Sequence, residues 1–418
     1  MEISLPYDTR HLPLSLEKTK NVIIAHPKES PALIHVKDKI RKAVLSPIGV
    51  GPLSTIVSPG LKIVIVVDDY TRPAPTKQLL PPLLSELLKY GIKKTDITII
   101  IAAGTHVPSS YEKMIQILGK EIVNQYSVIS SDVKNSTYVS VGTSSYGNEI
   151  QVLKEYVEAD IKILVGDIEY HYYAGYGGTR KSVLPGVSSV KSIQQNHGMM
   201  FHKECAMGIL DTNPINTEMI EAMDMAGCDF ALSAVLNSQH EIVGVWAGDP
   251  KRVMQKGVAL VDEMYKKKFC QLQDIVISAA DGSPHDINLY QALKALYSAS
   301  RIAKKNGVII LIAACPEGIG NELYASWLEK YTSAYEIQEL LEKDFKLGAH
   351  KAFYHRQATE KNMVILVSEL QDSFVKEKLG FIPASNPNEA LKMAVAQVKK
   401  NPNILVAPRG STTFFECK

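Results

Sequence analysis

Short runs of β-branched, apolar residues recur along the chain, and each leads through a polar turn into a helical stretch. In the first half, strands are predicted at Lys62–Val67, Asp96–Ala103 and Ile161–Val165, and a helix with an apolar repeat of 3.6 residues at Gln78–Tyr90. Continuous apolar strands that alternate with helices are typical of a parallel sheet covered on both faces. We therefore predict an α/β fold, in which ligands bind beyond the carboxyl ends of the strands.

The same alternation restarts in the second half, after a predicted hairpin at Phe230–Trp246 and a long helix at Asp249–Lys267. The expected elements there are strands at Asp274–Ser278, Val308–Ala313, Met363–Ser368 and Ile404–Ala407, and helices at Asp286–Lys304 and Asn388–Lys400. The length of 418 residues also favours two domains. We place the boundary near Lys268, which gives an N-terminal α/β domain over 1–268 and a C-terminal one over 269–418. Both sheets are expected to be largely parallel, with the active site in the cleft between the domains.

The composition excludes several classes of protein. The formal net charge is only +2, so neither nucleic acid nor an anionic membrane is an expected partner. No apolar run is long enough to cross a membrane, and the first residues do not resemble a signal peptide. The five cysteines are scattered, without a CxxC pair, which disfavours disulfides and a thiolate zinc site. A cytoplasmic protein is therefore expected.

Polar residues that can do chemistry follow the predicted strands. The segment after the first strand contains Asp69 and Arg72 among prolines. Aspartate and proline suit a helix N-terminus, but arginine does not, and its guanidinium is suited to gripping a carboxylate. His106 follows the small residues 102–105, which leave room for a ligand, and His171 follows the third strand. Imidazoles can move protons or bind metal near neutral pH.

The glycine-rich segment 175–182 differs by one residue from a phosphate-binding P-loop. Arg180 stands where the second glycine belongs, and Pro185 and Gly186 would disrupt the helix that a P-loop lysine opens. A nucleotide triphosphatase is therefore disfavoured. The glycines still permit close approach to a ligand, and Arg180 and Lys181 favour an anion. A helix predicted at Lys191–His197 would bring His197 back towards Lys181.

In the second half, Asp286 is the expected N-cap of a helix. Tyr290 and Lys294 are four residues apart on one face of this helix, with Gln291 beside them. The residues alone favour an ordinary surface helix; the alternative is a polar cluster at the helix start that faces the cleft between the domains and binds an anionic substrate.

Taken together, these segments resemble the nickel-dependent lactate racemase family over nearly the whole chain. The matching segments are Asp69-Tyr-Thr-Arg72-Pro, Gly104-Thr-His106, His171 through Lys181 to Pro185-Gly186, His197, and Asp286-Ile-Asn-Leu-Tyr290-Gln291-Ala-Leu-Lys294. The intervals of ten residues from His171 to Lys181 and sixteen from Lys181 to His197 match as well. Three positions depart from the usual pattern: Tyr170 replaces a proline, Gly177 a serine and Thr179 a glycine.

The resemblance implies a nickel-pincer nucleotide, a pyridinium mononucleotide whose sulfur-containing arms hold nickel. Lys181 would carry it covalently beside Gly177, Gly178 and Arg180, and His197 would be a nickel ligand. The resemblance further implies that His106 and His171 are the paired acid/bases, and that the substrate is bound by Asp69, Arg72, Tyr290, Gln291 and Lys294. Separate enzymes would synthesise the cofactor.

The implied reaction is inversion of C2 of a 2-hydroxy acid, either lactate or a related acid. A histidine takes the hydroxyl proton while the cofactor accepts hydride, and the 2-oxo acid is then reduced on its opposite face. Two alternatives remain open. One is a metal-dependent hydrolase with a histidine-ligated metal, which would need further metal ligands and no Lys181. The other is a noncatalytic protein that binds 2-hydroxy acids on the same scaffold.

Overall fold

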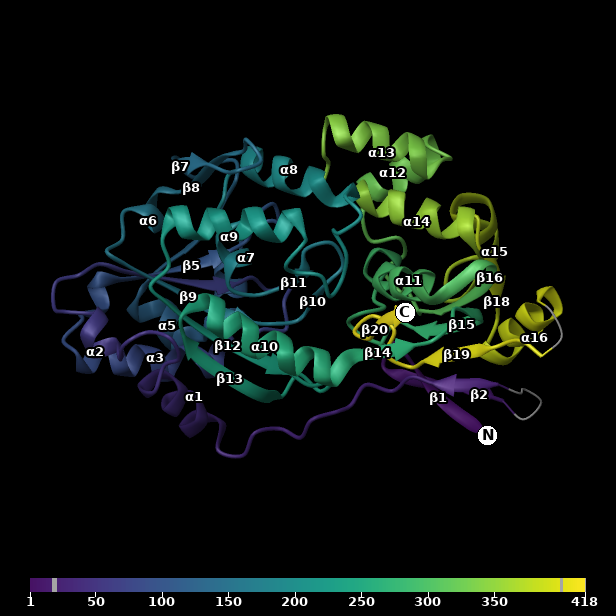
Figure 1. Cartoon of the computed structure of the whole chain (residues 1–418), viewed down its shortest axis with the longest axis horizontal. Helices are drawn as coiled ribbons and strands as arrows, with labels where there is room; N and C mark the ends of the chain where they lie inside the picture. Colours follow the sequence, from purple (N-terminus) through teal and green to yellow (C-terminus); the bar gives the residue numbers. More distant parts are fainter. Residues whose placement is uncertain (17–20, 399–400, 418) are drawn as a thin grey trace. The chain divides into compact units, whose positions relative to one another are not determined.

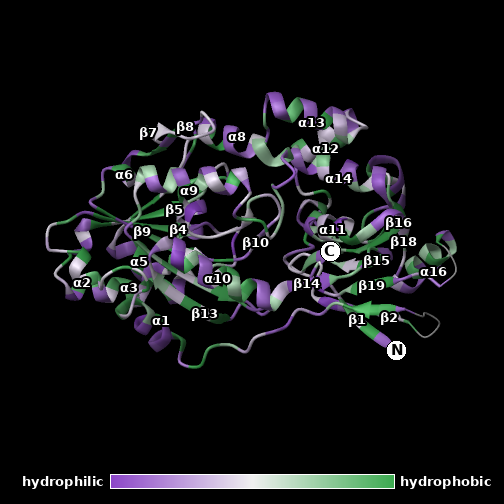
Figure 2. Ribbon diagram, viewed as in Figure 1, coloured by the Kyte–Doolittle hydropathy of each residue, from purple (hydrophilic) through white to green (hydrophobic). Residues whose placement is uncertain are grey.

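The computed structural model describes residues 1–16, 21–398 and 401–417. The chain forms two compact units (Figure 1). One consists of Glu29–Met264, and the other of Met1–Lys28 together with Tyr265–Lys418. Each has its own six-stranded sheet, and apolar residues are concentrated in the strands of both sheets (Figure 2). This confirms the predicted α/β class with largely parallel sheets.

The sheet of the unit Glu29–Met264 has the strand order β13-β12-β9-β4-β5-β6. Its strands are β4 (Ile63–Asp68), β5 (Ile97–Ala102), β6 (Ser127–Ser130), β9 (Ile161–Asp167), β12 (Phe230–Leu236) and β13 (Ile242–Gly248). All neighbours pair in parallel except β12 and β13, which form the predicted hairpin. Two small hairpins accompany the sheet: β7 (Tyr138–Thr143) with β8 (Glu149–Leu153), and β10 (Tyr170–His171) with β11 (Gly175–Tyr176).

Helices cover both faces of this sheet. They are α1 (Val36–Leu45), α2 (Leu53–Ile56), α3 (Thr76–Lys89), α4 (Tyr111–Leu118), α5 (Lys120–Gln125), α6 (Lys154–Val157), α7 (Arg180–Val183), α8 (Val190–Gly198), α9 (Pro214–Ala226) and α10 (Pro250–Tyr265). In β4, Ile63, Ile65 and Val67 share one core with residues of α1 and α3. Val64 and Val66 alternate with them and are equally buried, so both faces of the strand are covered.

The second unit has an all-parallel sheet with the order β18-β17-β16-β15-β19-β3. The strands are β3 (Val22–Ile24), β15 (Gln273–Ala279), β16 (Ala303–Ile312), β17 (Met363–Val367), β18 (Ile382–Ala384) and β19 (Ile404–Ala407). Two further pairs are β1 (Glu2–Tyr7) with β2 (Arg10–Ser15), and β14 (Lys266–Phe269) with β20 (Phe414–Cys417). The helices are α11 (Leu289–Ile302), α12 (Glu322–Lys330), α13 (Ala334–Lys343), α14 (His350–Lys361), α15 (Asp372–Phe374) and α16 (Pro387–Gln397).

Two predictions need correction. Residues 1–28 were expected in the N-terminal domain, but β3 pairs with β19 and so completes the sheet of the other unit. The long helix, expected to reach Lys267, ends at Tyr265, and the lysines that follow it form β14. The units divide between Met264 and Tyr265, four residues before the boundary placed near Lys268. The predicted helix at Asn388–Lys400 corresponds to α16, and its last two residues lie outside the described part of the chain.

No helix among the described residues is long and apolar enough to cross a membrane.

Candidate active site

The candidate site lies at the carboxyl ends of three adjacent strands in the unit Glu29–Met264. β4 pairs with β5 on one side and with β9 on the other. Because the three strands are parallel, their carboxyl ends meet at one edge of the sheet. Asp69 follows β4, His106 follows β5, and His171 lies four residues after the end of β9. The sheet therefore gathers side chains that are about 100 residues apart in sequence.

Asp69 and His106 form a hydrogen-bonded pair. His106 Nδ1 lies 2.8 Å from Asp69 Oδ2, and the Thr71 hydroxyl donates to Asp69 Oδ1 at 2.7 Å. Burial alone would raise the pKa of Asp69, but the hydrogen bonds from His106 and Thr71 outweigh burial and lower it. A carboxylate accepts only, so Nδ1 of His106 carries the proton and Nε2 of the neutral ring keeps its lone pair. His106 is thereby oriented to accept a proton at Nε2.

Backbone hydrogen bonds connect the His106 loop with the segment that carries Lys181. The Gly104 N–H donates to Gly186 O at 3.0 Å, and the Gly186 N–H donates to Lys181 O at 3.0 Å. The Ser131 hydroxyl also donates to Gly186 O, at 3.0 Å. Gly104 has φ +52°, in the left-handed region that favours glycine. Backbone hydrogen bonds thus hold the His106 loop against the segment that carries Lys181.

Lys181 lies in the short helix α7, among cationic neighbours. Burial, with Arg72 and Arg180, lowers the pKa of its amine well below the usual range. A lowered pKa increases the fraction of neutral amine, which is the nucleophilic form. This environment suits covalent attachment of a ligand.

Arg180 does not have the predicted ligand-binding geometry. Its Nε donates to Asn216 Oδ1 at 2.7 Å, Nη1 donates to the carbonyls of Gly177 and Gly178, and Nη2 donates to those of Ala174 and Tyr176. These bonds use all five N–H groups of the guanidinium. The prediction that Arg180 binds the cofactor is therefore not supported, because the side chain holds the loop 174–178 in place.

The two predicted glycines differ in environment. Gly178 has φ +89°, and a Cβ there would lie 2.7 Å from Asp167 O and 2.8 Å from Ile168 Cγ1, so packing within the protein already requires glycine. At Gly177 a Cβ would come no nearer than 3.4 Å to Glu169. Gly177 therefore has space beside it that Gly178 lacks.

His171 and His197 are connected through the ring of Tyr173. The ring centroids are 4.4 Å apart between His171 and Tyr173, and 5.1 Å apart between Tyr173 and His197. His171 Nδ1 accepts the Ala174 N–H at 3.2 Å, so the neutral ring carries its proton on Nε2. His106 and His171 thus present opposite hydrogen-bonding groups at Nε2, a lone pair and an N–H.

His197 lies in the last turn of helix α8, whose N-cap is Ser189. Burial first, and then the charges of Lys181 and His106, lower the pKa of His197 to about 3. Its ring is therefore neutral at physiological pH, which is the state that binds metals.

Acidic residues that the sequence analysis did not select complete the site. Arg72 Nη1 lies 3.5 Å from Glu169 Oε1. Desolvation, reinforced by neighbouring carboxylates, raises the pKa of Asp68 to about 7 and that of Asp167 well above its usual range. The sequence could have identified them by their position, because Asp68 is the last residue of β4 and Asp167 is the last residue of β9.

The other unit holds the remaining predicted residues on α11. Tyr290 packs against Tyr324 with ring centroids 6.1 Å apart, and Lys351 Nζ lies 5.4 Å from the centre of the Tyr290 ring. Lys294 is near enough to Asp281 to lower its pKa, although burial raises the net value to about 6. Tyr290, Gln291 and Lys294 thus share one helix, and their predicted role in substrate binding stays a prediction.

The expected N-cap of this helix was wrong. Asn288 caps α11 by accepting the Gln291 N–H at 3.1 Å. Asp286 Oδ2 instead accepts the N–H groups of Asp8, at 2.8 Å, and Ala314, at 3.1 Å. Asp286 therefore joins distant segments of its unit.

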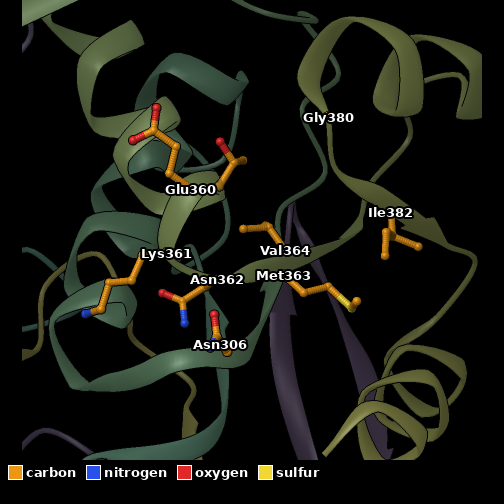
Figure 3. Close-up of a pocket in the computed structure, with 9 residues that line it drawn as sticks. Asn306, Glu360, Lys361, Asn362, Met363, Val364, Gly380 and Ile382 are labelled. Carbon is orange, nitrogen blue, oxygen red and sulfur yellow. The ribbon is translucent and has the colours of Figure 1, made fainter. Parts of the chain in front are cut away.

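A separate hollow of about 400 Å³ in this unit is lined by Asn306, Asn362, Met363 and neighbouring residues (Figure 3). It lies where β17 and β18 begin, at the amino ends of the strands. Asn362 Nδ2 donates to the carbonyls of Lys304 and Gly307, which gives this side chain a structural role. The hollow is therefore unrelated to the strand-end site.

Comparison with known proteins gives the family. Residues 7–208 match the family described as Lactate racemase N-terminal domain, and residues 269–414 match Lactate racemase C-terminal domain. The chain belongs to the lactate racemase family. The two matched segments include every residue of the predicted site.

Members of the lactate racemase family with known names and structures match over the full length. The protein named Lactate racemase from Thermoanaerobacterium thermosaccharolyticum is 30% identical, covering 100% of this chain and 99% of the relative. The Lactate racemase from Lactiplantibacillus plantarum is 29% identical, covering 98% of each chain. The structure of the T. thermosaccharolyticum lactate racemase apoprotein superposes with a TM-score of 0.91 at 31% identity, covering 100% of both chains. A Thermotoga maritima protein shares the fold alone, with a TM-score of 0.68 at 18% identity, covering 93% of this chain and 100% of that one.

Proposed function

We propose that this protein is a 2-hydroxy-acid racemase that acts on lactate, with His106 and His171 as its acid/base pair and a nickel-pincer nucleotide on Lys181. The observation that carries the proposal is the arrangement of the two imidazoles. They follow β5 and β9, the strands on either side of β4, and present opposite hydrogen-bonding groups at Nε2, while backbone hydrogen bonds join the His106 loop to the segment that carries Lys181. Lactate is the first substrate to test because two full-length relatives are named lactate racemases.

The residues present fit such a cofactor. When bound, the nucleotide would accept the hydrogen at C2 of the substrate as hydride and return it. The lowered pKa of Lys181 favours the neutral amine needed for covalent attachment. Buried His197 can donate one nitrogen to a metal. Among the described residues no group of three His, Cys, Asp or Glu side chains could hold a metal, so nickel would take its other ligands from the cofactor.

The chain's own residues would bind the substrate and move its protons. His106 Nε2 would accept the hydroxyl proton, while Asp69 stabilises the imidazolium that results. His171, in its protonated form, would return a proton from Nε2 to the substrate oxygen and so become the neutral ring. In the reverse direction the two rings exchange these roles. General acid-base catalysis by such groups typically contributes about 10²–10⁴-fold.

Arg72 is the proposed anchor of the substrate carboxylate. Its side chain is 30% exposed, and its ion-pair partner Glu169 is 3.5 Å away, a loose contact that a carboxylate can replace. Desolvation acts to lower the pKa of Arg72, but the carboxyls of Glu169, Asp69, Asp68 and Asp167 outweigh it and raise the pKa, which keeps the guanidinium charged.

The alternatives explain fewer of these features. A hydrolase with a histidine-ligated metal needs several protein ligands, and the described part of the chain offers no group of three. A noncatalytic binding protein has no use for an imidazole held by a buried aspartate or for an amine of lowered pKa. Both features support catalysis.

The test uses protein produced with the enzymes that synthesise the nickel-pincer nucleotide. Racemisation of single lactate enantiomers is followed by chiral chromatography, and the peptide containing Lys181 is weighed by mass spectrometry. We expect racemisation in both directions, added mass on Lys181 and about one nickel per chain. His106→Ala and His171→Ala should each lose about 10²–10⁴-fold in rate while the cofactor stays attached. Full activity with unmodified Lys181 would rule out the cofactor assignment. A holoprotein that inverts neither lactate nor malate nor 2-hydroxyglutarate would favour the binding protein.

A further inference from the structure

A chain of buried hydrogen bonds leads from helix α9 to the ring of His197. Glu218, on α9, is fully buried, and its Oε2 accepts the side-chain N–H of Asn196 at 2.8 Å. Asn196 Oδ1 lies 3.1 Å from His197 Nδ1. Asn196 and His197 are neighbours on α8, so the chain joins two helices of the same unit.

The acceptors around Asn196 fix which way its amide faces. Its Nδ2 points at Glu218 Oε2 and at Ile215 O, 3.3 Å away. The carbonyl accepts only and the carboxylate accepts at this oxygen, so the NH₂ group must lie on that side. Asn196 Oδ1 then faces His197, and because an amide oxygen also accepts only, His197 Nδ1 must carry the hydrogen. A neutral imidazole with its proton on Nδ1 has its lone pair on Nε2.

Glu218 is itself held in one orientation by a different part of the unit. The Ser144 hydroxyl donates to Oε1 at 2.7 Å, and Asn148 Nδ2 donates to Oε2 at 3.1 Å. Both residues lie in the turn between β7 and β8. Three donors from two separate segments thus meet on one buried side chain, which prevents it from turning away from Asn196.

We propose that Asn196 and Glu218 are positioning residues that fix the Nδ1–H tautomer of His197 and so direct Nε2 to nickel. The tautomer follows from the hydrogen bonds alone, whereas nickel as the ligand rests on the proposed function. Metal-bound histidines commonly donate their second ring N–H to an acceptor, and loss of that acceptor typically weakens metal binding about 10–100-fold. Neither residue would touch substrate or metal.

The first test measures the tautomer in cofactor-free wild-type protein. Histidine is labelled with ¹⁵N at both ring nitrogens, and the His197 signals are assigned by their loss in His197→Gln. We expect Nδ1 to resonate as a protonated nitrogen and Nε2 as an unprotonated one. The opposite pattern would overturn the proposal, and this outcome requires no folded variant of the buried network.

The second test compares variants in cofactor-free protein and in holoprotein. Asn196→Leu removes the acceptor of the His197 Nδ1–H, and Glu218→Leu removes the carboxylate that orients Asn196. In both variants we expect His197 to shift towards the Nε2–H tautomer. Holoprotein of these variants should lose nickel to a chelator about 10–100-fold faster than wild type, as measured by metal analysis. Glu218→Gln keeps an oxygen that can face Asn196, and it should restore both properties. Unchanged tautomer and unchanged nickel loss in correctly folded Asn196→Leu would contradict the proposal.

Ser144→Ala is the matched control. It removes a donor to Glu218 Oε1, the oxygen that faces away from Asn196, so it should lower thermal stability without changing the His197 tautomer. Because the tautomer is measured without the cofactor and nickel loss is measured with it, the two measurements also distinguish this proposal from the proposed function. If the protein never carries nickel, the proposed function fails while the tautomer result in the cofactor-free protein still stands.

Discussion

At the strand ends, the positive charge of Arg72 interacts with the negative charges of several carboxylates. Asp68, Asp69, Asp167 and Glu169 all act on its guanidinium. A substrate carboxylate that displaced Glu169 would keep the positive charge paired while it formed charge-assisted hydrogen bonds.

Replacement of Arg72 tests this role. A hydrogen bond to a charged group is worth roughly 1.5–3 kcal/mol, so Arg72→Ala should raise KM for lactate about 10–100-fold. Arg72→Lys should also be impaired, because a point charge cannot reproduce the planar fork. Steady-state kinetics with each enantiomer of lactate measures both variants. An unchanged KM in Arg72→Ala would show that the carboxylate is bound elsewhere.

The partly buried Asp68 carboxyl makes stability depend on pH. Its pKa is raised from 3.8 to about 7, so the folded state holds this proton to a higher pH than the unfolded chain does. Stability from this group is therefore complete below about pH 4 and is lost as the pH rises towards 7. Asp68→Asn should raise the free energy of unfolding at pH 8 by roughly 1–3 kcal/mol, and much less at pH 4.

Urea unfolding at the two pH values measures this change. Asp224→Asn is a suitable control, since Asp224 is half-exposed and pairs with Lys251 at the surface. It should change the pH profile little. A gain in Asp68→Asn that is equal at both pH values would show that the carboxyl is not the cause.

At the scale of elements, helix α7 begins at a strained residue. Thr179, its N-cap, is buried and has φ +40° and ψ −101°, a conformation that β-branched residues rarely adopt. This is a position where the family resemblance leads one to expect glycine. Backbone strain of this kind costs of order 1–3 kcal/mol and is found at functional sites. Lys181 follows two residues later, so the strained turn sets the direction of the helix that carries it.

Thr179→Gly should relieve the strain and raise the free energy of unfolding by about 1 kcal/mol, less than the full strain because glycine also gains freedom in the unfolded chain. Thr179→Ala removes the branched side chain but keeps a Cβ at positive φ, so it should gain less. Thermal unfolding of the cofactor-free protein measures both. Destabilisation by glycine would mean that contacts of the threonine side chain outweigh the strain.

Several strands and strand-end residues could be predicted from the sequence, whereas some side-chain roles could not. Strands β4, β5, β9, β15 and β19 were predictable because each is a continuous apolar run, and the residues at their ends follow from the parallel arrangement. The role of Arg180 was not predictable, because its partners are mostly backbone carbonyls of one loop. The N-cap of α11 was missed because Asp286 and Asn288 are equally good caps in sequence, and only the distant Asp8 N–H decides between them.

At the scale of the whole molecule, the first 28 residues belong to the unit formed by the C-terminal part of the chain. Strand β3 has only three residues, too few to be recognised from periodicity, and its partner β19 lies about 380 residues later. Pairing over such a distance leaves no local signal. Leu5 and Leu14, from the β1-β2 hairpin, are fully buried in the same core as Ile277 and Ile310 of the second sheet.

Because residues 1–28 belong to the second unit, a core mutation in this segment should destabilise the strands of that unit. Leu5→Ala should cost about 2–5 kcal/mol through lost burial and a residual cavity. Hydrogen exchange measured by mass spectrometry should then show faster exchange in β15, β16 and β19, although these strands are more than 260 residues away in sequence. Exchange in β4 and β5 should change far less. Leu79→Ala, in the core of the other unit, is the matched control and should give the reverse pattern, because Leu79 packs with the residues of β4 and β5. Faster exchange confined to β4 and β5 in Leu5→Ala would mean that the N-terminal segment supports the unit Glu29–Met264 instead.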